Sequence, residues 1–121
     1  MQRTACACLE TMIQAFDSCP QKVEVFIGPG IGSCCFEISR DLISQVNKTF
    51  GNFDDIINQN ENHCTWDLKK TNQLMLVQKG IRTENIYDCH LCTSCHPGDF
   101  YSYRRDQGIT GRMGAFICIE N

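Results

Sequence analysis

Residues 23–32 read VEVFIGPGIG. This stretch sets the class of fold, and the other segments are arranged around it. The valines, phenylalanine and isoleucine of Val23–Ile27 predict a short strand. Three glycines in the next five residues predict a sharp turn, because glycine accepts positive φ and lets another group approach the backbone. The turn lacks the lysine and hydroxyl of a phosphate-binding P-loop. A tight turn into a buried strand and a pocket wall both remain open for it.

Amphipathic helices are predicted on both sides of this strand, because apolar residues recur there at helical spacing. The polar residues 51–62 predict a surface excursion, and Asp67 predicts the N-cap of a helix that follows it. The predicted elements are helices over 4–16, 39–50 and 67–79, and strands over 23–27, 86–89 and 114–119. Their order predicts an α+β fold in which a mixed sheet is layered with helices.

Composition favours one ordinary globular domain. The 121 residues are 42% hydrophobic and 21% charged, with a formal net charge of -3. That charge gives no general attraction to nucleic acid or to an anionic membrane, so any anion site must be local. No apolar stretch approaches the length needed to span a bilayer.

Ten cysteines raise the question of a secreted disulfide scaffold. No secretory leader is recognisable, and most cysteines stand where a small apolar residue would serve, as Cys6, Cys8 and Cys118 do. We therefore expect reduced thiols and a cytoplasmic location.

Residues 89–113, CHLCTSCHPGDFYSYRRDQGITGRM, concentrate the unusual chemistry. Cys89, Cys92 and Cys95 are spaced C-x2-C-x2-C, which resembles part of a zinc knuckle. A closed site needs a fourth ligand, and the distant candidates are His63 and Cys64. Thiols packed at a strand end are the alternative, and the sequence favours it.

Aromatic residues alternate with polar ones just downstream, and two arginines and a carboxylate follow them in Phe100–Asp106. Aromatic faces stack on a flat ring, while arginine forks bind phosphate or carboxylate. The segment therefore suits a nucleoside plus phosphate. A surface pair of Arg105 with Asp106, on a strand whose aromatics face the core, is an equal alternative.

Several spaced motifs resemble the laccase-domain family, also called the multicopper polyphenol oxidase or YfiH-like family. They occur in the same order along nearly the whole chain. The motifs are GPxIGxCCFE at 28–37, the Asp67-Leu68 helix start with Leu74 and Gly80, CTxC at 92–95, FxSYRRD at 100–106 and TGRM at 110–113.

This resemblance implies a YfiH-like fold and a cytoplasmic purine nucleoside phosphorylase. Its substrates would be phosphate with adenosine, inosine, guanosine or methylthioadenosine, and adenosine deamination would be a further activity. The family's metal, taken as zinc and as copper in the older naming, is held by two histidines and a cysteine in motifs resembling QVH, TADC and HAGWRG. None of these motifs occurs in the 121 residues.

The resemblance therefore implies that residues 1–121 are the C-terminal half of such a domain, an incomplete domain without the family's metal ligands. It implies a catalytic role for Arg105 and substrate binding by Phe100, Tyr103 and Arg104, with no metal ligand assigned in this chain. The expected partner is a missing N-terminal half or a second copy in a homo-oligomer. The alternative is a non-catalytic fragment, or a zinc-knuckle-like module that uses Cys89, Cys92 and Cys95.

Overall fold

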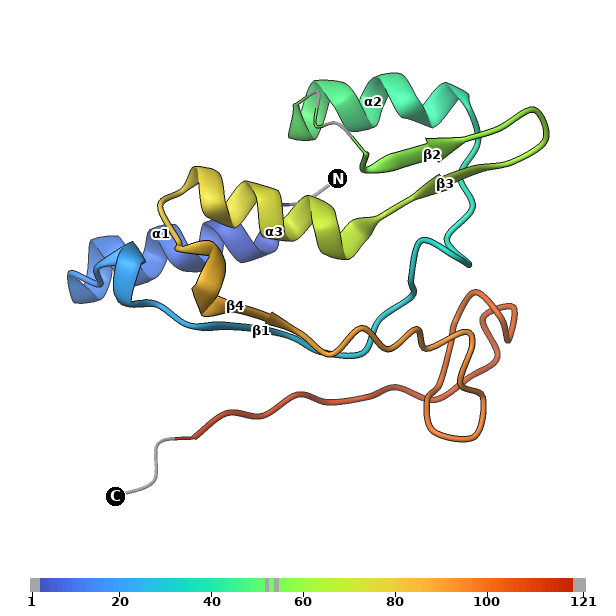
Figure 1. The fold of residues 1–121 in the computed structure, drawn as a ribbon. Helices are drawn as coiled ribbons and strands as arrows, with labels where there is room; N and C mark the ends of the chain where they lie inside the picture. The colour runs from blue at the N-terminus through green and yellow to red at the C-terminus, as the bar shows by residue number, and fades with distance from the viewer. Residues whose placement is uncertain (1–2, 52, 54, 119–121) are drawn as a thin grey trace.

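The computed structural model describes residues 3–51, 53 and 55–118 (Figure 1). Helices and short strands alternate along the chain, which confirms the predicted α+β class. The elements are α1 (Thr4–Phe16), η1 (Pro20–Lys22), β1 (Val25–Ile27), α2 (Asp41–Phe50), β2 (Ile57–Gln59), β3 (Cys64–Trp66), α3 (Leu68–Gln78), η2 (Thr83–Asn85) and β4 (Ile86–Asp88). None of the described helices combines the length and the apolar character needed to cross a membrane.

Strands β1 and β4 pair in parallel, with Val25 opposite Ile86 and Ile27 opposite Asp88. Helices α1 and α3 lie side by side against one face of this pair (Figure 1). A core forms between them from Cys6, Leu9, Met75, Leu76 and Ile81, each less than 10% exposed. The helices predicted over 4–16 and 67–79 are confirmed as α1 and α3. Each buries one apolar face in this core.

A second core lies between α2 and the antiparallel hairpin of β2 and β3. Val46, Ile56 and Trp66 form it, and the Trp66 indole N–H donates to the Thr71 hydroxyl over 2.8 Å. The surface excursion predicted for residues 51–62 is therefore partly wrong. Ile56 is fully buried, while Asn58 and Gln59 in β2 are exposed. The exposed polar residues of the strand made this segment read as surface in the sequence.

The described chain contains two two-stranded sheets instead of one larger mixed sheet. The strand predicted over 114–119 is not formed in residues 114–118, and Ile119 lies outside the described residues. This segment leaves the loops as an extended chain (Figure 1), with Phe116 98% and Ile117 100% exposed. A strand needs a hydrogen-bonding neighbour, and no described segment provides one for it.

Asp67 is confirmed as the N-cap of α3, because its side chain accepts a hydrogen bond from the Lys70 backbone N–H over 2.9 Å. Loss of this bond in Asp67→Ala should lower the free energy of unfolding by about 1 kcal/mol, whereas Asp67→Asn, which keeps a capping oxygen, should lose much less. Urea unfolding of the two variants tests this expectation. Equal losses in both would show that the cap is not what stabilises the helix start.

Candidate functional site

Two loops leave the C-terminal ends of the paired strands β1 and β4 and run beside each other. A parallel bridge between Gly30 and Cys92 extends the pairing beyond the strands. It is made by the Gly30 N–H donating to the Leu91 carbonyl over 3.3 Å and the Thr93 N–H donating to the Gly30 carbonyl over 3.1 Å. Residues some sixty positions apart in the sequence are therefore held side by side.

Four thiols meet where these loops touch: Cys34 and Cys35 from the first loop, and Cys92 and Cys95 from the second. Their sulfur atoms all lie within 4.8 Å of one another. The Cys95 sulfur is 3.6 Å from that of Cys34 and 3.4 Å from that of Cys35. Cys92 is buried, whereas Cys34 and Cys95 are exposed. This arrangement offers four soft ligand atoms around one point.

Cys92 and Cys34 have shifted pKa values, in opposite directions. Burial raises the pKa of the Cys92 thiol, but backbone N–H groups of Gly32, Cys95 and Ser94 donate to its sulfur and lower the pKa to about 6. For Cys34, burial and then the hydrogen bonds to Cys95 and Cys92 raise the pKa to about 12. The Cys92 thiol therefore ionises more readily than the Cys34 thiol.

Gly32 is needed for the close contact between the loops. Its N–H donates to the Cys92 sulfur over 3.2 Å. A Cβ at this position would lie 3.3 Å from both the Cys34 sulfur and the Cys92 Cβ. Glycine thus lets the backbone approach the sulfur atoms, which favours the pocket-wall interpretation of the glycine turn over a plain turn.

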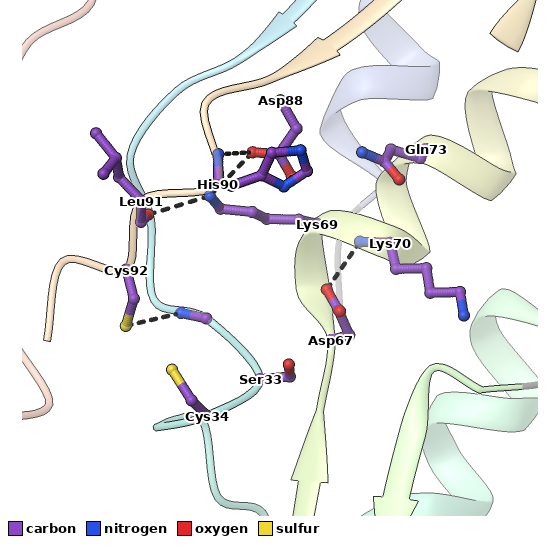
Figure 2. A pocket seen from close by; sticks show the side chains of 11 residues that line it. Ser33, Cys34, Asp67, Lys69, Lys70, Gln73, Asp88, His90, Leu91 and Cys92 are labelled. Atoms are coloured by element: carbon purple, nitrogen blue, oxygen red, sulfur yellow. Dashed lines mark hydrogen bonds and ion pairs between the residues drawn. The ribbon is translucent and has the colours of Figure 1, made fainter. Parts of the chain in front are cut away.

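A cavity of about 350 Å³ opens beside the thiols, and Figure 2 shows its lining. At its centre the Lys69 ammonium donates to the Asp88 carboxylate and to the Leu91 carbonyl, each over 3.1 Å. The side chains of Lys69 and Asp88 are only 13% and 7% exposed. Burial raises the Asp88 pKa, but the His90 backbone N–H and the Lys69 ammonium outweigh burial and hold the pKa below its usual value. The ion pair fixes α3 to the start of the second loop.

Arg105 directs its guanidinium into its own loop. Nη1 donates to the carbonyls of Thr93 and Ser94 over 2.8 and 3.4 Å, and Nη2 donates to the Phe100 carbonyl over 3.1 Å. Nε and Nη2 also form a bidentate pair with the Asp106 carboxylate, at 2.7 and 2.9 Å. The side chain thereby holds the segment that carries Cys95 to the following turn.

The other predicted substrate residues line two separate hollows around this loop. Phe100 and Arg105 line one of about 470 Å³, whereas Tyr103 and Arg104 line another of about 300 Å³. Arg104 donates to the Glu37 carbonyl over 2.8 Å, and its guanidinium lies 4.8 Å from the centre of the Phe36 ring. The structure thus brings the four residues onto one loop, but not into one cavity.

The sequence offered a knuckle of Cys89, Cys92 and Cys95 as an alternative, and the structure groups different cysteines. Among the described residues Cys89 lies outside the thiol group, and Cys34 and Cys35 take part instead. The expected distant ligand His63 lies on the hairpin, where its Nδ1 is 3.0 Å from the Glu37 carboxylate. A signal for including Cys34 and Cys35 was present in the sequence. Their CC pair follows one predicted strand and the C-x2-C of Cys92 and Cys95 follows another, so parallel pairing of the two strands would bring the four thiols together.

The two-histidine, one-cysteine metal site that the family resemblance implies is not formed by the described residues. Within the described part of the chain, the grouped metal-ligand side chains are the four cysteines alone, without His63, His90 or His96. The donor set is therefore all sulfur.

Comparison with known proteins places the chain among longer proteins. The family described as Multi-copper polyphenol oxidoreductase laccase matches residues 1–120. Purine nucleoside phosphorylase YlmD of Geobacillus stearothermophilus is 36% identical over an alignment of 108 positions that covers 81% of this chain and 36% of that protein. Human purine nucleoside phosphorylase LACC1 is 33% identical over an alignment of 123 positions, gaps included, that covers 96% of this chain and 27% of LACC1.

The fold agrees with solved structures of these relatives. The crystal structure of YlmD from Geobacillus stearothermophilus aligns with a TM-score of 0.82 at 29% identity, covering 90% of this chain and 41% of YlmD. The crystal structure of the Bacillus licheniformis hypothetical protein YfiH aligns with a TM-score of 0.77 at 30% identity, covering 88% of this chain and 40% of YfiH. The predicted YfiH-like fold is confirmed. The chain spans about a third of the length of the curated relatives that it matches.

The Lys69–Asp88 pair predicts how stability depends on pH. The pKa of Asp88 is lower in the folded protein than in the unfolded chain, where it is about 3.9. The ionised carboxylate therefore contributes fully to the free energy of unfolding above about pH 3.9, and this contribution is lost as pH falls through the pKa of the folded state. Asp88→Asn should cost about 3 kcal/mol at neutral pH, because it leaves the Lys69 ammonium unpaired, and should flatten the acid branch of the stability curve. Urea unfolding at several pH values measures both effects.

Asp99→Asn is the matched control, because Asp99 is an exposed aspartate on the same loop. It should leave both the stability and its pH dependence unchanged. An acid branch that Asp88→Asn leaves intact would show that Asp88 is not its source.

Proposed function

Because this chain belongs to the multi-copper polyphenol oxidoreductase laccase family, we propose that residues 1–121 are the C-terminal half of a purine nucleoside phosphorylase. Similarity to relatives named purine nucleoside phosphorylase, along most of the chain, carries the proposal. The reaction transfers the pentose of a purine nucleoside to phosphate. The proposed nucleosides are adenosine, inosine, guanosine and methylthioadenosine, with adenosine deamination as a second activity, in the cytoplasm.

Phosphorolysis requires a phosphate oxygen to attack the anomeric carbon while the purine leaves with the electrons of the glycosidic bond. Positioning the phosphate and stabilising charge on the purine would supply most of the rate. The segment that follows β4 suits the positioning task, because its aromatic residues and its two arginines are among the residues that line two hollows. The remaining chemistry would fall to residues outside this chain.

We propose that activity requires Arg105. Its hydrogen bonds to Asp106 and to three carbonyls favour an indirect role, in which it fixes the loop that carries Phe100 and Tyr103. Arg104 is the better candidate for direct contact, because its guanidinium lines the 300 Å³ hollow together with Tyr103. In this arrangement Arg104 would contact phosphate or ribose, and Tyr103 would stack against the purine.

The second half of the domain is part of the proposal. Apolar side chains of residues 109–117 are exposed in this chain, including Ile109 at 90% and Phe116 at 98%. An upstream half with a HAGWRG-like segment would cover such surface and supply the family's metal ligands. The half would reside on the same polypeptide, or come from a partner or a second copy.

Reconstitution tests this function. The chain joined to an upstream half should convert inosine and phosphate to hypoxanthine and ribose 1-phosphate, whereas the chain alone should not. Arg105→Ala should lower kcat by about 10²-fold or more, because the loop loses its internal clamp. Arg82→Ala is the matched control, since Arg82 is exposed and lies outside the hollows.

Steady-state kinetics distinguish the direct role proposed for Arg104 from the indirect role proposed for Arg105. Arg104→Ala should mainly raise the KM for phosphate, and Arg105→Ala should mainly lower kcat. If the chain binds the upstream half but the complex cleaves none of the four nucleosides, the proposed phosphorylase activity is contradicted and a non-catalytic module is favoured.

A further inference from the structure

We propose that Cys34, Cys35, Cys92 and Cys95 bind one zinc ion as a structural tetrathiolate site. This site is separate from the family's metal, whose ligands are two histidines and a cysteine. It also differs from the knuckle that the sequence offered as an alternative, because Cys89 is not a ligand. The proposal stands on the geometry of the two loops and does not depend on the phosphorylase activity.

Distances between the sulfur atoms carry the first step. Four thiolates at about 2.3 Å from a tetrahedral zinc ion lie about 3.8 Å from one another. The Cys95 sulfur is 3.6 Å from that of Cys34 and 3.4 Å from that of Cys35, and all four sulfurs lie within 4.8 Å. Small side-chain adjustments would therefore place every sulfur at zinc-binding distance.

The origin of the ligands carries the second step. Cys34 and Cys35 come from the turn after β1, and Cys92 and Cys95 come from the loop after β4. Structural zinc sites commonly take two ligands from each of two loops, so that the ion joins segments that are distant in sequence. Cys92 and Cys95 have the usual C-x2-C spacing, whereas Cys34 and Cys35 are adjacent. Four protein ligands leave no open position for substrate, so the site would stabilise the loops and would not catalyse a reaction.

Backbone N–H groups that surround the sulfur carry the third step. Gly32 donates its N–H to the Cys92 sulfur over 3.2 Å, and the turn brings the N–H groups of Ser94 and Cys95 to the same atom. Donors of this kind stabilise the negative charge of metal-bound thiolates and hold them in position. The Gly32 N–H keeps this position because no side chain separates the two loops.

Simple core packing does not explain the group. Buried cysteines often act as small apolar residues, but Cys34 and Cys95 are exposed. All ten cysteines are free thiols in this structure, which is the state that metal binding needs. Soft thiolate ligands in tetrahedral arrangement select zinc among the common divalent ions that lack redox chemistry.

The proposed ion would lie at the base of the Arg105 loop. Arg105 donates to the carbonyls of Thr93 and Ser94, the two residues between the ligands Cys92 and Cys95. Zinc would therefore hold both ends of this four-residue segment, and Arg105 would hold its two middle residues. Loss of zinc should loosen the loop that carries Phe100, Tyr103 and Arg104.

Metal analysis of the full 121-residue chain tests the proposal. The chain is purified under reducing conditions after removal of any histidine tag, and zinc is measured per chain by mass spectrometry of the metal. We expect one zinc ion per chain. Cys92→Ser and Cys35→Ser should each lower the affinity by more than the roughly 10–100-fold that loss of an outer hydrogen-bonding partner costs.

Cys89→Ser and Cys19→Ser are the matched controls and should retain the zinc. Loss of zinc in Cys89→Ser, with retention in Cys35→Ser, would favour the sequence-based knuckle and overturn the proposal. A metal-free chain, a chain with iron in place of zinc, or a disulfide between any two of the four thiols in the freshly purified protein would also overturn it.

Cobalt substitution keeps the test decisive if a serine variant fails to fold. Cobalt in the wild-type chain should show intense visible bands of a tetrahedral ion and thiolate-to-cobalt charge transfer. Cys95→His replaces one sulfur ligand by an imidazole nitrogen. The variant should therefore bind cobalt with weaker thiolate-to-cobalt charge transfer and with shifted visible bands. Identical spectra in the two proteins would show that Cys95 is not a ligand.

Discussion

Parallel pairing of β1 with β4 is the interaction on which the rest of the structure depends. It joins segments sixty residues apart, and the Gly30–Cys92 bridge continues it beyond the strands. A parallel pair requires a long connection, and here α2, the β2–β3 hairpin and α3 form that connection. The loops at the carboxyl ends of both strands consequently meet, which is where functional groups gather in parallel sheets.

Three local features keep these loops in place. The Lys69–Asp88 ion pair joins α3 to the second loop, the absence of a side chain at Gly32 lets the loops touch, and Arg105 closes the second loop on itself. Each feature is a polar or steric constraint, and none buries much apolar surface. The loops therefore owe their shape to specific contacts, which is consistent with a binding or metal-bearing role.

Apolar surface is unevenly covered in this chain. One face of the β1–β4 pair is buried under α1 and α3, while Phe26 and Tyr87 on the other face are 71% and 50% exposed. The segment 114–118 is also exposed and extended. Exposed apolar residues on this scale are typical of a surface that another polypeptide segment covers. They agree with the small share of its relatives' length that the chain spans.

The sequence by itself determined the helices, because each has an apolar stripe at helical spacing, and it determined the Asp67 cap, the α+β class and the family. It also placed Phe100–Arg105 on one segment, whose roles remain predictions. Only the tertiary structure decided that β2 and β3 pair, since β2 is polar on its outer face. Only that structure brought Cys34 and Cys35 to Cys92 and Cys95 in place of Cys89. The reason is that spacing along the chain records local geometry, whereas strand pairing sets the distances between loops.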